Sequence, residues 1–357
     1  MSDLLYSEIE EELRSSVRAL LTDHCPPSAV LARCEGPEPY DGPLWHSLAV
    51  GLGTAGLQIP ERDGGAGASI REVAVVLEEL GRAVAPVPYF GHAVLAVTAL
   101  LAAGDRELLP ALADGSRTAA LAVPFSTAPG APLPAVAVGP GGRLTGRITS
   151  VADALPADVL LVPAGGRLYA VEAAAVTVTR RTSLDLTRQL ADLTLADAPG
   201  RLLADGQEPV RQALLTGAGL VASEQLGIAE WCLGTTVAYL KERRQFGRAL
   251  GSFQALKHRL ADLWLETVGG RAAARYAADA LATDSPDTAV AVAVAQAHCG
   301  ALAVRAAEEC VQLHGGIGMT WEHPAHLYLK RAKADQLALG TPGHHRNTLA
   351  ALVDLPI

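Results

Sequence analysis

The sequence predicts an α+β protein with an N-terminal helical domain, a small middle β domain and a C-terminal bundle of four helices. Apolar residues recur at helical spacing in the first third of the chain. Short strand-like runs separated by Pro, Gly and Asp follow, and long helical patterns then return. A chain of 357 residues is long enough for more than one core, and we expect domains at residues 1–117, 118–200 and 201–357.

The N-terminal region is predicted to be helical from Leu4 to about Gly115. Apolar residues recur there every three or four positions, and residues 94–103 are almost entirely Ala, Leu and Val. Between these helices, Ile59–Gly67 is IPERDGGAG, whose proline and consecutive glycines predict a loop. Such a loop can border a ligand or simply connect two helices, and the sequence leaves both interpretations open.

The middle region contains the runs AALAV, AVAV, DVLLVPA, LYAV, AVTVT and ADLTL, which predict several short strands. Four helices are then predicted at Val210–Lys241, Phe253–Thr283, Thr288–Leu313 and Ala325–Leu337. These helices are rich in Ala and have few polar positions, so we expect many of them to be buried on more than one face, as in an oligomer core. The isolated chain is therefore expected to self-associate or aggregate.

Composition excludes several classes of protein. The chain is 50% hydrophobic and 19% charged, which excludes a disordered or fibrous protein. Its formal charge is −9 and it has no basic run, which argues against nucleic acid as a partner. It contains no P-loop, no GxGxxG after a strand and no evident Ser/His/Asp or Cys/His set, which argues against hydrolytic and Rossmann chemistry.

The five cysteines are scattered, odd in number and without CxxC spacing, so we expect buried free thiols in a reducing compartment and no structural zinc. The N-terminus is acidic and amphipathic, which is not typical of a signal or transit peptide. No sufficiently long apolar run is free of Arg, Asp or Pro, so no membrane span is expected. These observations predict a cytoplasmic protein.

Two strings carry candidate binding residues: ERRQFGRALGSFQALKHRLAD (Glu242–Asp262) and QLHGGIGMTWEHPAHLYLKRAKADQLALGT (Gln312–Thr341). In the first, Arg243 and Arg244 end a helix, Gly247 allows a turn, and Phe253 and Gln254 open the next helix. A cation and amides at such a junction suit a phosphate group. In the second, a pair of glycines permits close backbone approach beside a glutamine. A helix cap and a simple turn would explain either string alone, but their joint occurrence favours a ligand site.

These strings resemble the acyl-CoA dehydrogenase family, and the resemblance covers essentially the whole chain. Leu44–Tyr89 is similar to the first helical domain of the family, and Leu144–Ala164 with Ser183–Leu195 is similar to its middle β domain. RRQFGR..GSFQ..KHRLAD and Q.HGG.G resemble its C-terminal motifs. The resemblance implies the acyl-CoA dehydrogenase fold, which agrees with the predicted order of helices and strands.

The resemblance also implies a cofactor and a reaction. Family enzymes hold FAD between the middle β domain of one subunit and the C-terminal helices of its dimer mate. They remove two hydrogens from an acyl-CoA thioester: a Glu takes the α-proton and the flavin takes the β-hydride. Arg is a fixed fork of donors for a pyrophosphate, and glycine lets backbone N–H groups reach it. The residues matching the family motifs, expected to meet the ADP part of FAD, are Arg243, Gln245, Phe246, Gln254, Gln312, Gly315 and Gly316.

The sequence differs from the family pattern at the positions of the catalytic base. Family members often carry this Glu directly before a Gly-Thr pair, where this chain has Leu339. The other known location aligns near Gly217, so we expect no catalytic base in this chain. Loss of a general base costs about 10²- to 10⁴-fold in rate. Glu224 and Glu230 lie on the same predicted helix as Gly217, about two and four turns away, and are the alternatives for a displaced base.

The middle domain departs as well. Val123–Pro134 (VPFSTAPGAPLP) replaces the usual Thr-Glu-Pro and Gly-Ser-Asp string, and Ser150 and Ala152 replace a Trp-x-Thr that commonly covers the flavin. The face for a neighbour's FAD is kept, whereas the face for the chain's own FAD is lost. The pattern, with Met319–Ala332, resembles the subunit without a base in actinobacterial α2β2 dehydrogenases that act on sterol side-chain or other bulky CoA thioesters. The expected partner is therefore a homologous subunit, or a second copy in a homo-oligomer.

Two alternatives stay open. One is a self-sufficient homotetrameric dehydrogenase with a displaced base, and the other is a dehydrogenase fold reused without redox chemistry. His344 and His345 suggest a metal or acid/base pair, but adjacent histidines point apart on a helix, so we expect a surface loop there and no metal site. Periodicity does not place Asp335 or His326 relative to the acyl pocket.

Overall fold

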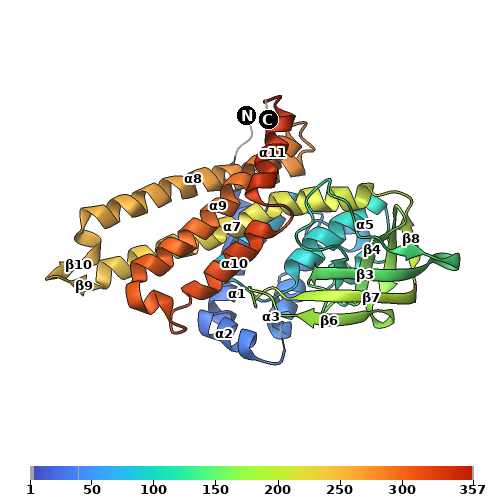
Figure 1. Cartoon of the computed structure of the whole chain (residues 1–357), viewed down its shortest axis with the longest axis horizontal. Helices are drawn as coiled ribbons and strands as arrows, with labels where there is room; N and C mark the ends of the chain where they lie inside the picture. Colours follow the sequence, from blue (N-terminus) through green and yellow to red (C-terminus); the bar gives the residue numbers. More distant parts are fainter. Residues whose placement is uncertain (1–3, 39, 356–357) are drawn as a thin grey trace.

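The computed structural model describes residues 4–38 and 40–355, so residues 1–3 of the predicted acidic N-terminus and Pro39 lie outside the described residues. The N-terminal part is helical, as predicted (Figure 1). The loop expected at Ile59–Gly67 contains only one short 3₁₀ turn. The elements are α1 (Glu8–His24), α2 (Pro27–Glu35), α3 (Gly42–His46), α4 (Ile70–Ala83), α5 (Val97–Ala103) and α6 (Leu109–Ala113), with π-helical η1 (Ser47–Gly51) and η4 (Phe90–Ala96) and 3₁₀ turns η2 (Thr54–Gly56) and η3 (Glu61–Asp63).

Helix α4 is the centre of this helical part. Ser69 and Glu72 form a capping box at its start, which satisfies two backbone donors that the helix leaves unpaired. Its other side lies directly on the backbone of α7 (Glu208–Glu242), because two glycines remove the side chains at the crossing. A Cβ at Gly81 would lie 2.1 Å from the Glu224 carbonyl oxygen, and a Cβ at Gly227 would lie 1.9 Å from that of Glu78. The N-terminal helices are thus fixed to the C-terminal bundle.

The middle region forms two four-stranded sheets. One has the order β1 (Ala119–Leu121), β4 (Val159–Ala164), β5 (Arg167–Glu172), β8 (Arg201–Ala204), and the other β2 (Ala137–Val138), β3 (Arg143–Ala152), β7 (Leu190–Pro199), β6 (Thr177–Arg181). Only β1 and β4 pair in parallel within these sheets. Apolar side chains of both sheets, such as Leu160 and Leu193, share one core. The predicted runs correspond to six of these strands, whereas β3, which is largely polar, and the short β8 were not predicted.

The C-terminal part confirms the four predicted helices: α7, α8 (Gln254–Ala282), α9 (Thr288–His314) and α10 (Ala325–Leu337). A hairpin of β9 (Arg244–Gln245) and β10 (Arg248–Ala249) and the 3₁₀ turn η7 (Leu250–Ser252) join α7 to α8, and η8 (Gly315–Met319) follows α9. A fifth helix, α11 (Pro342–Leu352), corrects the surface loop expected around His344 and His345. Thr341 caps this helix and Pro342 occupies its first position, which favours a helix start.

The whole molecule is elongated along the bundle (Figure 1). The two sheets lie at one end and the β9–β10 hairpin lies at the other, with α7, α8 and α9 running between them. The five cysteines are free and buried, as expected. Among residues 4–38 and 40–355, one helical stretch, Thr288–Met319, is long and apolar enough to cross a membrane, but most of its apolar window is buried in the protein, as in a core helix.

Candidate functional site

Five of the seven predicted cofactor-binding residues line one cleft of about 640 Å³ at the hairpin end of the bundle: Arg243, Gln245, Gln312, Gly315 and Gly316. The cleft, which we call the Arg243 cleft, is bounded by the end of α7, the hairpin, the start of α8 and the end of α9. Tyr239, Arg259 and His314 also line it, although the sequence analysis did not select them. His314 lies inside the Q.HGG.G string, and this position was the signal that could have identified it.

The other two predicted residues lie outside the lining of this cleft. Phe246 is at the tip of the hairpin, where it and Gly247 have φ angles of 53° and 76°, and its side chain is 87% exposed. Positive φ at both central residues is typical of the type I′ turn that two-residue hairpins favour. Gln254 is exposed at the first position of α8. The hairpin therefore presents Phe246 outward, away from the chain's own core.

The donors of the Arg243 cleft suit an anionic ligand. Arg243 is exposed, and its guanidinium makes no hydrogen bond or ion pair within residues 4–38 and 40–355. Arg259, in contrast, is paired with Glu309 at 2.7 Å. A Cβ at Gly315 or Gly316 would meet no atom within 4 Å, so this side of the backbone is open to a ligand. A free guanidinium beside open backbone and amide side chains fits the pyrophosphate of a dinucleotide.

A second region contains Gly217 and Leu339, the two positions at which the resemblance predicts that a family base would lie. Gly217 and Leu339 are 122 positions apart in sequence numbering but touch in space: a Cβ at Gly217 would lie 2.9 Å from Leu339 Cδ1 and 2.5 Å from Leu95 Cδ2. Leu339 is fully buried. Leu95 belongs to η4, which also brings Phe90 to within 3.6 Å of the same point. Neither position carries a carboxylate, and apolar side chains fill the space between them.

The backbone at Leu339 keeps an unusual conformation. Its φ is 52°, in the left-handed region that residues other than Gly and Asn seldom adopt. The Leu339 N–H donates to the Phe125 carbonyl at 2.9 Å, and the Leu339 carbonyl accepts from His345 Nε2 at 3.0 Å. Burial lowers the pKa of His345, so its ring is neutral and carries its proton on the donating Nε2. His345, expected on a surface loop, instead supports this turn.

A buried ionic cluster lies next to the two base positions. Arg188 donates to Glu224 at 2.6 Å and to Asp335 at 2.8 Å. Arg331 donates to the other oxygen of Glu224 at 2.9 Å and pairs with Asp185 at 2.9 Å. Both oxygens of Glu224 are thus engaged, and neither is free to take a proton from a ligand. Glu224 is accordingly not placed as a displaced base.

The pKa values of several groups in this cluster are shifted from their ordinary values. Burial and the neighbouring Glu224 raise the pKa of Asp335 well above its ordinary value, although the paired Arg188 and Arg331 oppose this shift. Burial also raises the pKa of Asp153. For Arg188, burial opposes the charge, but Glu224 and Asp335 outweigh it and raise its pKa. Asp335 therefore faces the ionic cluster rather than an open pocket.

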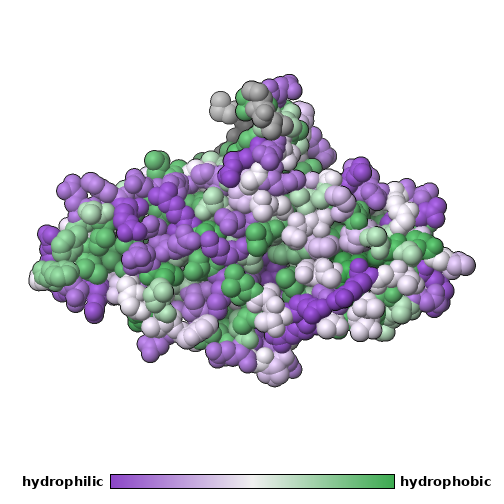
Figure 2. Space-filling model, in the orientation of Figure 1, coloured by the Kyte–Doolittle hydropathy of each residue, from purple (hydrophilic) through white to green (hydrophobic). Residues whose placement is uncertain are grey.

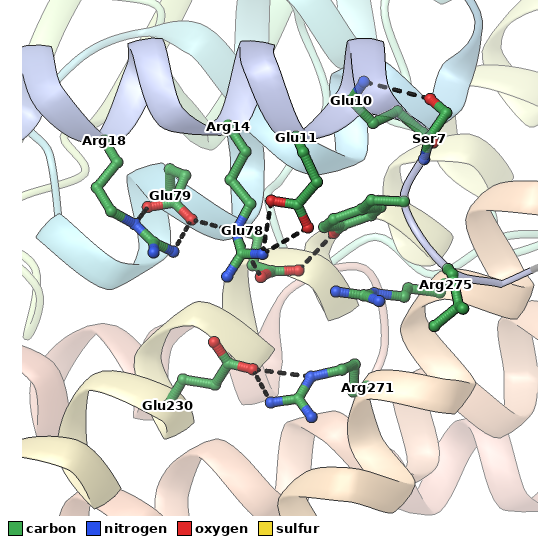
Figure 3. A network of polar contacts seen from close by, with 12 residues as sticks. Ser7, Glu10, Glu11, Arg14, Arg18, Glu78, Glu79, Glu230, Arg271 and Arg275 are labelled. Atoms are coloured by element: carbon green, nitrogen blue, oxygen red, sulfur yellow. Dashed lines mark hydrogen bonds and ion pairs between the residues drawn. The ribbon is translucent and has the colours of Figure 1, made fainter.

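The remaining candidates lie elsewhere. Glu230 accepts a hydrogen bond from Arg271 at 3.0 Å between α7 and α8 (Figure 3), so it is not directed at the base positions. His326 lies at the start of α10 with its ring edge toward Trp321, 4.6 Å between ring centres. Among the described residues, no group of three His, Cys, Asp or Glu side chains is arranged to hold a metal ion.

The segments that replace the flavin-binding strings fold onto each other. Phe125 N–H donates to the Ser150 carbonyl at 2.9 Å, and Pro124 forms a bridge with Val151. The Phe125 ring packs edge-on against Phe90, and the Arg188 guanidinium lies 5.0 and 5.2 Å from these two ring centres. Aromatic rings and a buried guanidinium thus occupy the interior between the Ser150 strand and the base positions.

Comparison with known sequences decides the family. The sequence model of the acyl-CoA dehydrogenase N-terminal domain matches residues 7–116, and that of the C-terminal domain matches residues 204–353. The chain belongs to the acyl-CoA dehydrogenase family. Members of this family are FAD-dependent oxidoreductases, in agreement with the cofactor expected from the sequence motifs.

Within the acyl-CoA dehydrogenase family, the chain is 38% identical over 353 residues to the acyl-CoA dehydrogenase IpdE2 of Mycolicibacterium smegmatis, covering 97% of this chain and 99% of that one. Two solved structures are also similar to this chain. The Tcur3481-Tcur3483 steroid ACAD G363A variant has a TM-score of 0.86 and 32% identity, covering 97% of this chain and 98% of that one. The ChsE4-ChsE5 complex from Mycobacterium tuberculosis has a TM-score of 0.87 and 29% identity, covering 100% of both chains.

Proposed function

We propose that this chain is the subunit without a catalytic base in a heteromeric, FAD-dependent acyl-CoA dehydrogenase. It contributes the Arg243 cleft to a composite FAD site whose flavin ring lies on a homologous partner subunit. When bound, FAD accepts the hydride removed from the acyl thioester. The residues of this chain bind and orient the ADP part, and the partner provides the base.

The separation of the two regions along α7 carries this proposal. At about 1.5 Å per residue, the stretch of α7 from Gly217 to Arg243 is about 39 Å long. Gly217 lies in the first part of α7 and Leu339 is hydrogen-bonded to Phe125, whereas the Arg243 cleft is lined by the last part of α7. Helix α7 runs from the sheets to the β9–β10 hairpin (Figure 1). An extended FAD molecule is too short to bridge this distance. A dinucleotide held by Arg243 must therefore place its ring against another chain.

The residues at the predicted base positions support the proposal that this chain provides no catalytic base. Position 339 is fully buried, and the family base positions meet in an apolar contact. A general base must come within hydrogen-bond reach of the proton that it removes. Neither Leu339 nor Gly217 can do so, and the nearby Glu224 is held by two arginines.

The relatives support the assembly and the substrate class. The names of two similar structures each join two components, ChsE4 with ChsE5 and Tcur3481 with Tcur3483, and the second structure is described as a steroid ACAD. We extend both properties to this chain as part of the proposal: an α2β2 heterotetramer acting on CoA thioesters of sterol-derived or other bulky acyl groups. The expected location is the cytoplasm, as the sequence composition suggested.

Co-expression with a homologous acyl-CoA dehydrogenase encoded beside this chain tests the proposal. We expect the two chains to elute together on size-exclusion chromatography with about one FAD for every two chains. Dehydrogenase activity should require both chains. Arg243→Ala in this chain should release FAD from the complex, because the guanidinium that meets the pyrophosphate is lost. Arg211→Ala is the matched control, since Arg211 is exposed near the other end of the same helix.

The outcomes separate the alternatives. One FAD per chain in the protein purified alone would contradict the proposal and favour a homotetramer with a displaced base. A colourless complex without activity would favour a fold reused without redox chemistry. Equal FAD retention in Arg243→Ala and Arg211→Ala would exclude the Arg243 cleft as the cofactor site.

A further inference from the structure

His314 borders the Arg243 cleft with one ring nitrogen already committed. Its Nδ1 lies 2.7 Å from the Cys310 carbonyl oxygen, one helical turn back on α9. A carbonyl oxygen only accepts, so Nδ1 carries a proton. Nε2 has no hydrogen-bond partner among the described residues. In the neutral ring Nε2 is therefore a bare acceptor, and only the doubly protonated ring can donate from it.

The ring is held in place on its faces as well. The Tyr239 ring stacks on it with centres 4.4 Å apart, and the His323 ring lies 4.1 Å away. His323 Nδ1 accepts from the Ala325 N–H at 3.2 Å, so the neutral His323 carries its proton on the other nitrogen. Burial and the charge of His314 lower the pKa of His323, which keeps it neutral beside His314. His314 is thus a preorganised group at the floor of the cleft.

The side chains that line the cleft supply one unpaired positive charge, which is one fewer than a pyrophosphate needs. A dinucleotide pyrophosphate carries two negative charges, whereas Arg243 is the one lining guanidinium without a partner among the described residues and Arg259 is neutralised by Glu309. A protonated His314 would balance the second charge. A charge-assisted hydrogen bond from an imidazolium to a phosphate oxygen is about twice as strong as a neutral one.

We propose that His314 is a nucleotide-binding residue of the Arg243 cleft, which takes up a proton when a pyrophosphate binds and donates from Nε2 to a phosphate oxygen. This inference rests on the proposed function for the identity of the nucleotide, FAD. The proton comes from solvent and is released when the ligand leaves. Both FAD and coenzyme A carry an adenosine pyrophosphate, so the shared recognition chemistry is the pyrophosphate.

The groups around His314 favour this protonation. Burial opposes it, but the hydrogen bonds to the Cys310 thiol and carbonyl raise the pKa of His314. The hydrogen bonds from Cys232 and His314 in turn lower the pKa of Cys310. From the elements packed around the ring, α7 supplies Tyr239, Cys232 and Arg243, α8 supplies Arg259, and the segment after η8 supplies His323. Arg243 and Arg259 oppose a second charge until a phosphate lies between them and the ring, which couples protonation to binding.

Isothermal titration calorimetry on the full-length chain tests the proposal. The titrants are ADP-ribose, FAD and coenzyme A, and ADP-ribose is the reference because its pyrophosphate does not titrate between about pH 5 and 9. Measurements in two buffers of different ionisation enthalpy give the protons taken up on binding. For the wild type we expect uptake of up to one proton and an affinity that falls by up to tenfold per pH unit above the pKa of free His314.

Two variants and one control complete the design. His314→Gln should bind without proton uptake and with a flat pH profile, and His314→Phe, which keeps the stack with Tyr239 and His323, should weaken binding roughly tenfold or more at pH 5.5. His24→Gln, at the exposed C-terminal end of α1, should behave as the wild type. Proton uptake that persists in His314→Gln, or no binding of any of the three ligands to the wild type, would overturn the inference.

The outcome is distinguishable from failure of the proposed function. Proton uptake through His314 combined with a flavin-free complex would leave this inference standing and remove the dehydrogenase role. A complex that binds FAD equally well with and without His314 would support the dehydrogenase role and contradict this inference. Tighter binding of coenzyme A than of FAD would support the pyrophosphate role of His314 and contradict the assignment of the cleft to FAD.

Discussion

At the scale of single residues, Leu339 combines a strained backbone with complete burial. It fills the space against Gly217 and is held by hydrogen bonds to Phe125 and His345. Leu339→Ala should lower the free energy of unfolding by roughly 2–5 kcal/mol, because it leaves a cavity that the surrounding helices cannot close. Urea denaturation followed by circular dichroism measures this. Leu337→Ala, at a position that is 56% exposed, is the control and should change stability by less than about 0.5 kcal/mol; equal losses would contradict the packing argument.

Asp335 gives a prediction for pH dependence. Its pKa is raised in the folded protein by burial and by Glu224, so between its unfolded and folded pKa values the folded state binds more protons than the unfolded state. Stability from this group is therefore present at low pH and decreases as pH rises above about 4, with a slope of at most about 1.4 kcal/mol per pH unit. Asp335→Asn cannot ionise and should flatten this decrease above about pH 4 in urea titrations. An identical pH profile in both proteins would show that Asp335 is ionised in the fold.

At the scale of elements, charged and polar side chains hold helix α1, and the segment before it, against helix α4 (Figure 3). Arg14 and Arg18 pair with Glu79 at 3.2 and 2.5 Å, and Glu78 and Arg275 lie in the same network. Tyr6 donates to Glu78 at 2.6 Å, and the Arg275 guanidinium lies 3.7 Å from its ring centre. Since Glu78 is almost fully buried, its carboxyl group depends on these partners.

Removal of the Tyr6 hydroxyl tests how strongly this element is attached. Tyr6→Phe should lower the free energy of unfolding by roughly 1–3 kcal/mol, because the Glu78 carboxyl loses a donor inside the protein. Native-state hydrogen exchange should also increase in α1 more than in α7. Tyr276→Phe, on the outer side of α8 with 37% exposure, is the matched control and should have little effect on either measurement. Unchanged exchange in α1 would mean that packing alone holds the helix.

At the scale of the whole molecule, apolar side chains are exposed on the C-terminal bundle. Phe246 and Met319 are 87% and 78% exposed, and Figure 2 shows hydrophobic surface at the hairpin end. Such surface favours association, so we expect the chain alone to self-associate with increasing concentration in sedimentation velocity experiments. The double change Phe246→Ser and Met319→Ser should shift the chain toward monomer. Leu184→Ser, at a 60% exposed position in the β domain, is the control, and an equal shift there would contradict a localised surface.

Much of this organisation could be predicted from the sequence, because it depends on local patterns. The four long helices follow from apolar spacing, and Arg243 and Gln312 follow from short motifs at the ends of helices. The sequence analysis predicted a surface loop where the short helix α11 lies, although Thr341 and Pro342 are ordinary helix-start signals. The ionic cluster could not be predicted: Arg188 and Asp335 are 147 positions apart, and only the packing of strands on helices brings them together.

The contact between Gly217 and Leu339 leaves no room for a carboxylate to be introduced at either position by a single mutation. A glutamate at position 217 would have to displace Leu95 and Leu339, which lie within 3 Å of its first side-chain carbon. A glutamate at position 339 would bring a further carboxyl group beside Glu224 and Asp335, where Arg188 and Arg331 are already shared among three carboxyl groups. A carboxylate at either position would thus require several simultaneous changes in the surrounding packing and charge.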